Sequence, residues 1–252
     1  MNNNVYVIIL AAGKGTRMNS DLPKVLHGVC GKPILSYILK TLNKLKYNIV
    51  IVVGHKKDLV IKEFGNKYKY AIQHKRLGTG HAVLSAKKQI PQKASAVMVL
   101  NGDDSAFYKP ETLQRLVEKH IHDKNMISIR SLVLRDPTGF GRIKRDENGD
   151  VVSIIEEKNA SPEDQKIKEV NIGCYCFDTG YLWNNLPKLS KNKITNEYYL
   201  TDLIKYAVQH NQKINAYPLK DSQEWFGVNT PEQLRIANKQ MQKCLNFKKS
   251  QQ

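Results

Sequence analysis

The first half of the chain alternates continuous apolar runs with stretches of helical spacing. The apolar runs cover residues 5–10, 49–53 and 96–100, and a shorter one covers 70–73. Such runs are typical of strands buried on both faces of a sheet. Helical patterns follow at residues 33–45, 57–64, 80–88 and 110–120. Repeated strand–helix units predict an α/β fold with a Rossmann-like, doubly wound, mostly parallel sheet, in which ligands bind at the carboxyl ends of the strands.

The second half is richer in strand patterns, which cover residues 126–134, 151–155 and 170–177. Helical patterns return at 198–209 and from Pro231 onward. No internal repeat and no linker-like stretch separates the two halves. We therefore expect one domain over residues 1–235 with a strand-rich subdomain, followed by a helix end and basic tail at 236–252.

The composition is that of an ordinary globular protein, with 41% hydrophobic and 25% charged residues. No stretch reaches the roughly 18 apolar residues of a membrane span, and no basic region precedes the first apolar run, so a signal peptide is not expected. The four cysteines form no Cys-x-x-Cys pair, which favours reduced thiols in a cytoplasmic protein. Cys174 and Cys176 share one face of a predicted strand and are expected in the core.

The formal net charge of +17 has two interpretations. It fits nucleic-acid binding, or lysines scattered over exposed faces. The basic residues form no arginine-rich block and no aromatic residues are interleaved with them, so no nucleic-acid partner is expected. A positive field also attracts a nucleoside triphosphate. His120 and His122 have no further ligand nearby in the sequence and are expected at the surface of a helix end.

The loop Leu10-Ala-Ala-Gly-Lys-Gly-Thr-Arg17 is the most distinctive feature of the sequence. It matches neither the phosphate-binding loop that ends in Gly-Lys-Ser/Thr nor the three-glycine dinucleotide fingerprint. Its small residues let the backbone approach a ligand closely, with amides directed at phosphate or a base. Arg17 can grip phosphate bidentately, and Lys24 can add a point charge. The alternative is a tight strand-to-helix turn without a ligand.

Several motifs occur in order over residues 5–235 and carry a family resemblance. They are the loop up to Met18, Ser20–His27, Gly31–Pro33, Gln73–Ala82, Asn101–Asp103, Asp136–Ile143, Glu156–Ala160, Glu169–Gly173, Asn196–Asp202 and Gly227–Asn229. Together they resemble bacterial sugar nucleotidyltransferases, and most closely the uridylyltransferase domain of N-acetylglucosamine-1-phosphate uridylyltransferases. The resemblance implies transfer of a uridylyl group from UTP to N-acetylglucosamine 1-phosphate, with Mg²⁺ as cofactor and release of pyrophosphate.

The resemblance also implies residue roles, carried over only where this sequence matches the family. The nucleotide would contact Leu10, Ala11, Ala12, Gly13, Lys14, Gly15, Gln73, Gly78 and Thr79. The sugar would contact Asn101, Gly102, Gly141, Glu156 and Asn171. Asp103 and Asn229 would hold Mg²⁺, and Arg17 and Lys24 would carry the catalysis.

These residue types suit those roles. The amide of Gln73 offers both a donor and an acceptor to a pyrimidine edge, and Mg²⁺ prefers one or two protein oxygens besides water and substrate phosphates. Simpler interpretations remain for single residues: Asp103 as a turn aspartate, Asn229 as a helix N-cap, Gly141 as a turn glycine and Glu156 as a surface carboxylate.

The sequence also departs from the family. No hexapeptide repeat follows, so neither acetyltransferase activity nor the trimer that such repeats build is expected. Asp104 stands next to the predicted metal ligand and is expected to face solvent, and Ile172 replaces a threonine common among relatives.

Several functional alternatives stay open. One is another sugar phosphate such as glucose 1-phosphate, or another nucleotide. A second is a non-catalytic nucleotide-sugar sensor. The sequence also leaves open the oligomeric state, and whether the chain is part of a longer protein or a single-function enzyme.

Overall fold

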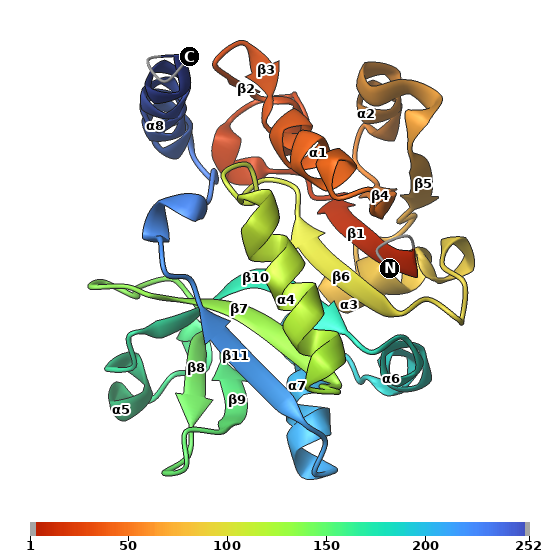
Figure 1. The fold of residues 1–252 in the computed structure, drawn as a ribbon, viewed down its shortest axis with the longest axis vertical. Helices are drawn as coiled ribbons and strands as arrows, with labels where there is room; N and C mark the ends of the chain where they lie inside the picture. The colour runs from red at the N-terminus through yellow and green to blue at the C-terminus, as the bar shows by residue number, and fades with distance from the viewer. Residues whose placement is uncertain (1–3, 250–252) are drawn as a thin grey trace.

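The chain folds around one mixed sheet, seen in a computed structural model that describes residues 4–249, with side chains up to residue 244 (Figure 1). Within these residues the sheet has nine strands, and its main path follows the order β11-β7-β10-β6-β1-β4-β5. The hairpin of β8 and β9 pairs with β10 beside this path. The predicted α/β class with a mostly parallel sheet is confirmed.

Parallel strands form the N-terminal half of the sheet, as the apolar runs predicted. They are β1 (Val5–Ala11), β4 (Asn48–Val53), β5 (Lys69–Ile72) and β6 (Ala96–Asn101). β1 lies between β4 and β6, and Leu10 is in register with Asn101. The carboxyl ends of β1 and β6 therefore meet, so the loop after β1 and the corner after β6 lie at one edge of the sheet.

The second half adds antiparallel pairing. β10 (Glu169–Phe177) runs antiparallel to both β6 and β7 (Ile127–Val133), and β11 (Ile214–Pro218) runs parallel to β7 at the edge. β8 (Arg142–Arg145) and β9 (Val151–Ile155) form a hairpin at the lower end of the molecule in Figure 1. The strand patterns predicted in this half correspond to β7, β9 and β10, whereas β8 was not predicted.

Helices cover both faces of the sheet. The first face buries residues of α1 (Ile34–Lys44), α2 (Lys57–Phe64) and α4 (Pro110–His122) in one cluster. The opposite face buries residues of α3 (Thr79–Ser85), α6 (Thr179–Asn185) and α7 (Asp202–Gln209) in a second cluster. Alternate residues of β1 supply the two clusters, because successive side chains of a strand point to opposite faces. The short helix α5 (Pro162–Gln165) lies beside the β8–β9 hairpin (Figure 1).

The last helix, α8 (Pro231–Lys249), lies at the other end of the molecule, beside the small hairpin of β2 (Gly28–Val29) and β3 (Lys32–Pro33) (Figure 1). Its Asn238 Oδ1 accepts a hydrogen bond of 2.8 Å from the backbone of Cys30. The helix runs through the boundary predicted at residue 235, and that division stays a prediction. Among the helices the structure describes, none has the length and apolar character needed to cross a membrane.

Two local predictions were wrong. The helix expected over residues 198–209 begins only at Asp202, because Tyr198 lies in a non-helical segment whose backbone is hydrogen-bonded to Leu77 and Gly80. His120, expected at the surface, is 2% exposed and its Nδ1 lies 3.0 Å from Ser128 Oγ. Burial lowers the pKa of His120 to about 4. The helical pattern did not indicate this burial, because buried positions are inferred from apolar residues and histidine is polar.

The cysteines behave as the sequence predicted. Cys174 and Cys176 are free and buried in the same cluster on one face of β10. Burial raises the pKa of Cys174 to about 12, so this thiol stays protonated.

Candidate active site

The loop after β1 forms an open backbone cradle. Gly15 has a φ of +64°, a conformation that glycine adopts readily, and it precedes the short 3₁₀ helix Thr16–Met18 that carries Arg17. Behind the loop, a Cβ on Gly54 would lie 3.0 Å from the carbonyl oxygen of Ala12, so the end of β4 packs closely against it. On the other side Gly13 is exposed, and no described atom lies within 4 Å of where its Cβ would be. One side of the loop is therefore packed against the end of β4, and the other side is exposed, so that a ligand can approach its backbone.

This cradle is one wall of a cleft of about 620 Å³. All residues predicted to hold the nucleotide line it: Leu10, Ala11, Ala12, Gly13, Lys14, Gly15, Gln73, Gly78 and Thr79. Arg17, Lys24, Asn101, Asp103 and Asn229 line it too. We call it the first cleft.

Gln73 lies on the far side of the first cleft, just after β5. Its Nε2 lies 3.0 Å from the carbonyl oxygen of Gly78 and 3.2 Å from His81 Nδ1. Burial lowers the pKa of His81, so its ring is neutral near pH 7 and the Nδ1 can accept a hydrogen bond. Both amide hydrogens of Gln73 are therefore used within the protein. Its Oε1 has no partner among the described residues and is left as an acceptor, where the sequence analysis expected Gln73 to offer a donor as well.

Gly78 and Thr79, at the start of α3, contact the segment that precedes α7. A Cβ on Gly78 would lie 2.5 Å from the carbonyl oxygen of Tyr198, and its φ is +92°. Thr79 Oγ1 accepts a hydrogen bond of 3.0 Å from the backbone of Leu200. The segment before α7 is thus held against the first cleft by a close approach that leaves no room for a Cβ at Gly78 and by the Thr79 hydrogen bond.

A second cleft of about 460 Å³ lies beside β10. Of the residues predicted to hold the sugar, Asn101, Gly141, Glu156 and Asn171 line it. Gly102 does not: it is buried below the floor, where a Cβ would lie 3.0 Å from Val25 Cγ1. Sequence reasoning missed Tyr175, Tyr199, Thr201 and Trp225, which also line this cleft. The family motif Asn196–Asp202 includes Tyr199 and Thr201, whereas none of the quoted motifs includes Tyr175 or Trp225.

Glu156 directly follows β9 and lines the second cleft. Its Oε1 lies 3.4 Å from Thr201 Oγ1, and a Cβ on Gly141 would lie 3.7 Å from its Oε2. Burial raises the pKa of Glu156, and the nearby Asp202 adds to this. The side chain is half-buried and lies against the cleft, so it is more than a surface carboxylate.

Asn171 is held by an irregularity in β10. The pairing with β7 shifts register between Asn171 and Cys174, and Gly173 within this bulge has a φ of +71°. The Asn171 amide donates to Tyr175 Oη at 2.7 Å and accepts from the backbone of Gly173 at 3.2 Å. The bulge therefore fixes the orientation of Asn171 at the wall of the second cleft.

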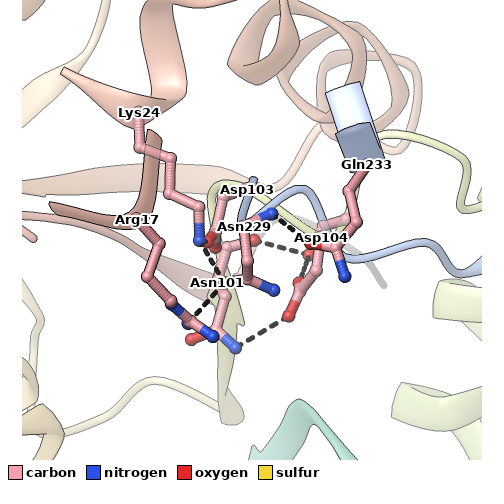
Figure 2. A network of polar contacts seen from close by, with 8 residues as sticks. Arg17, Lys24, Asn101, Asp103, Asp104, Asn229 and Gln233 are labelled. Atoms are coloured by element: carbon pink, nitrogen blue, oxygen red, sulfur yellow. Dashed lines mark hydrogen bonds and ion pairs between the residues drawn. The ribbon is translucent and has the colours of Figure 1, made fainter. Parts of the chain in front are cut away.

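Six polar residues line both clefts, and four of them form a hydrogen-bonded group: Arg17, Lys24, Asp103 and Asn229 (Figure 2). Lys24 Nζ donates to the Asp103 carboxylate and, at 2.6 Å, to Asn229 Oδ1. Arg17 also donates to Asn229 Oδ1, at 2.8 Å. The backbone of Val228 donates to the carbonyl oxygen of Asp103 at 3.1 Å, which ties the distant 228–229 segment to the corner after β6. Residues from three separate parts of the chain thus form one centre, which we call the junction.

The side chain of Asn229 is not used to cap α8, because the neighbouring Thr230 provides the N-cap contact. The hydroxyl of Thr230 accepts a hydrogen bond of 3.2 Å from the backbone of Gln233 in the first turn of α8. The alternative interpretation of Asn229 as the helix N-cap is therefore wrong.

The junction offers donors suited to a hard divalent cation. Among the described residues, no group of three or more His, Cys, Asp or Glu side chains is arranged so that it could hold a metal ion. However, the Asp103 and Asn229 side-chain oxygens converge on the same Lys24 ammonium group, so both already face one cationic position. A carboxylate and an amide oxygen fit Mg²⁺, which takes few protein ligands. These two residues could hold the ion.

Asp104 differs from its prediction. It was expected to face solvent, but it is 9% exposed. Its Oδ2 accepts a hydrogen bond of 2.9 Å from Asn101 Nδ2, and Ser105 Oγ lies 3.0 Å from its Oδ1. Burial raises the pKa of Asp104 well above its usual range, and the adjacent Asp103 charge adds to this. The solvent-facing prediction failed because it ignored the neighbours at positions 101 and 105.

Comparisons with known proteins agree with this architecture. A family model described as nucleotidyl transferase matches residues 6–243. The chain is 42% identical over 240 residues to the "Bifunctional protein GlmU" of Limosilactobacillus reuteri, covering 95% of this chain and 52% of that protein. It is 41% identical over 242 residues to the protein of the same name from Caldanaerobacter subterraneus subsp. tengcongensis, covering 96% and 52%. The chain spans about half the length of the curated relatives it matches.

Among solved structures, the chain is similar to a crystal structure described as a putative glucose-1-phosphate thymidylyltransferase from Bacillus anthracis in complex with a sucrose. The TM-score is 0.75 at 23% sequence identity, and the match covers 93% of this chain and 94% of that one. A likeness at this identity supports the fold.

Proposed function

The chain belongs to the nucleotidyl transferase family, and we propose that within it this protein transfers the uridylyl group of UTP to N-acetylglucosamine 1-phosphate. The observation that carries the proposal is the junction, where Arg17, Lys24, Asp103 and Asn229 line both clefts. Two ligands bound in these clefts would bring their reactive groups together among these side chains. Holding two reactants in this way is a large part of catalysis.

The first cleft suits a uridine nucleotide. Gln73 offers an acceptor and no free donor, because its amide hydrogens are taken by Gly78 and His81. Uracil carries an N–H at position 3, whereas cytosine has an acceptor there, so this geometry favours uracil over cytosine. The open side of Gly13 would accommodate the remainder of the nucleotide beside the backbone.

The second cleft suits an amino sugar. Glu156 and Asn171 provide a carboxylate and an amide that can accept or donate to sugar hydroxyls and an acetamido group. Tyr175, Tyr199 and Trp225 supply aromatic surface in the same cleft. The family resemblance at Gly141, Glu156 and Asn171 favours N-acetylglucosamine over glucose.

The reaction then follows from the arrangement. A phosphate oxygen of the sugar phosphate attacks the α-phosphorus of UTP, a new P–O bond forms, and the bond from the α-phosphorus to the bridging oxygen breaks. Pyrophosphate leaves with the electron pair. Because the nucleophile is already an anion, no general base is required. Lys24 and Arg17 hold the phosphates in place and offset the negative charge that builds up on them.

Asp103 and Asn229 would hold Mg²⁺ at the junction. When bound, the ion supplies positive charge and a template for the phosphate oxygens. Lys24, which donates to the same two oxygens, would turn toward the phosphates. We also expect the enzyme to work in the cytoplasm, because its cysteines are all unpaired in the described structure and suit a reducing compartment.

A pyrophosphate-release assay across a panel of nucleoside triphosphates and sugar 1-phosphates tests the proposal. We expect the highest kcat/KM with UTP and N-acetylglucosamine 1-phosphate, and much lower values with CTP or with glucose 1-phosphate. A preference for glucose 1-phosphate would identify a different sugar transferase. Binding of UTP without pyrophosphate release from any sugar phosphate would indicate a sensor and overturn the proposal.

A further inference from the structure

Asn101 lies at the boundary of the two clefts, at the end of β6, and its side chain is held from behind by Asp104 (Figure 2). We propose that Asp104 is a positioning residue that fixes the Asn101 amide, so that Asn101 Oδ1 accepts a hydrogen bond from one hydroxyl of the sugar phosphate. This inference rests on the proposed function, because it assigns a specificity contact for the same substrate.

The first support is the way Asn101 is held at both of its ends. Asp104 Oδ2 accepts from the Asn101 side chain at 2.9 Å, while Ser105 Oγ donates to the Asn101 backbone carbonyl at 2.6 Å. Ser105 Oγ also lies 3.0 Å from Asp104 Oδ1. Asp104 and Ser105 are 9% and 1% exposed, so this support lies inside the protein.

The second support is that Gly173 encloses the amide nitrogen. A Cβ on Gly173 would lie 2.1 Å from Asn101 Nδ2 and 3.6 Å from Asp104 Oδ2, so the nitrogen is packed between the β10 bulge and the buried carboxyl group. Asn101 Oδ1, in contrast, has no partner among the described residues. Figure 2 shows it pointing away from Asp104. The oxygen is thus the part of the amide that a ligand can reach.

The chemistry of an amide oxygen selects the ligand group. It only accepts hydrogen bonds, so it pairs with a hydroxyl or N–H and repels phosphate oxygens. The phosphates are met instead by Lys24 and Arg17. The Asn101 amide packs against Gly173. The backbone N–H of Gly173 in turn donates a hydrogen bond to Asn171 Oδ1 in the wall of the second cleft. The group that meets Asn101 Oδ1 is therefore a hydroxyl of the sugar.

Monodeoxy analogues of the sugar 1-phosphate provide the test. One of these analogues lacks the hydroxyl that contacts Asn101. The unaltered enzyme should use this analogue with a kcat/KM roughly five- to ten-fold lower than for the natural sugar phosphate, which is the effect of losing one hydrogen bond. Asp104→Ala and Asn101→Ala should each turn over the natural sugar less well by a similar factor. They should also lose the discrimination against that one analogue, while the KM for UTP changes little.

Two further variants separate positioning from general damage. Asp104→Asn keeps an oxygen that can accept from Asn101 and should retain most of the discrimination. Asp178→Ala removes the carboxylate that caps α6 by accepting from the backbone of Tyr181 at 2.7 Å, outside both clefts. It should lower stability and leave the discrimination intact.

The outcomes are distinct. If Asn101→Ala and Asp104→Ala both still discriminate against every deoxy analogue as the unaltered enzyme does, this inference is overturned. The proposed function would then still stand. If Asp104→Ala does not fold, the Asn101→Ala result alone decides whether Asn101 meets a hydroxyl, and loss of discrimination in the folded Asp104→Asn variant would contradict the positioning role. Absence of pyrophosphate release by the unaltered enzyme with N-acetylglucosamine 1-phosphate would instead defeat the proposed function itself.

Discussion

The two clefts are built by different means. The first cleft takes much of its wall from one continuous loop, residues 10–17, whose backbone faces the ligand space. The second cleft collects side chains from Glu156 just after β9, from β10, and from the segments before α7 and α8. A backbone wall tolerates many side chains but depends on glycines, whereas a side-chain wall depends on particular functional groups. The junction belongs to both clefts, so changes there should affect both ligands.

The largest effect is expected at the junction. Lys24→Ala removes the ammonium group that contacts both Asp103 and Asn229 and that we place on the phosphates. Turnover should fall by about 10²–10³-fold, the usual cost of losing a charge-stabilising donor. Steady-state pyrophosphate release measures it. The matched control is Lys62→Ala, an exposed lysine on α2, and a Lys24 variant as active as this control would remove Lys24 from the centre.

The metal dependence should change at Asp103. Asp103→Asn replaces a carboxylate oxygen with a neutral one, so the Mg²⁺ concentration at half-maximal rate should rise by at least about ten-fold. A titration of the rate with Mg²⁺ at saturating substrates measures this concentration. Asp58→Asn, at the exposed start of α2, should leave the titration unchanged. An identical curve for the Asp103 variant would exclude it as a metal ligand.

A closely packed glycine of the first cleft should also be sensitive to substitution. Gly78→Ala combines a φ of +92° with a Cβ position 2.5 Å from the Tyr198 carbonyl oxygen. The strain should lower the free energy of unfolding by about 1–3 kcal/mol and raise the KM for UTP. Gly149→Ala is the control: Gly149 has a similar φ of +84°, but no described atom lies within 4 Å of its Cβ position. Urea unfolding should therefore show a smaller loss of free energy of unfolding for Gly149→Ala than for Gly78→Ala. Equal losses in the two variants would contradict the role assigned to close packing at Gly78.

A milder and pH-dependent effect is expected on the side-chain-built side. Glu156→Gln should raise the KM for the sugar phosphate by roughly five- to ten-fold and leave the KM for UTP nearly unchanged. Because burial raises the pKa of Glu156, its carboxylate takes up a proton at a higher pH than an ordinary glutamate. Sugar binding should therefore weaken as the pH falls through that raised pKa, and this pH dependence should be absent in the Gln variant.

The control for Glu156 is Glu163→Gln, an exposed carboxylate on α5. It should reproduce the unaltered KM values across the pH range. A Glu156 variant that keeps both the KM for the sugar and its pH profile would show that the second cleft binds the sugar without this carboxylate.

The same contrast explains how much the sequence predicts. Continuous apolar runs predicted β1, β4 and β6 because a strand buried on both faces needs no polar residues. They also placed the loop after β1 correctly at a strand end. β8 (Arg142–Arg145) escaped prediction because its residues are mostly charged: Arg142 is 1% exposed and is buried through polar contacts with Phe140 and Glu157.

The site shows the same limit. The loop residues 10–17 of the first cleft are contiguous in the sequence and could be predicted as a group. At the junction, the phosphate-binding roles of Arg17 and Lys24 were predicted from their chemistry beside the loop. The metal-binding roles of Asp103 and Asn229 were predicted only through the family resemblance, since these two residues are far apart in the chain. Asp104 and Gly102 were misplaced, because burial at the corner after β6 depends on the packing of Gly173 and Val25 around it. Nothing in the local sequence pattern encodes such contacts.

The central claim is that the sugar phosphate attacks the α-phosphorus of UTP at the junction. It is tested most directly with N-acetylglucosamine 1-phosphate carrying ¹⁸O in its non-ester phosphate oxygens, followed by mass spectrometry of both products. All of the label should appear in UDP-N-acetylglucosamine and none in pyrophosphate. Label in pyrophosphate, or a labelled sugar product without a uridine, would contradict the account.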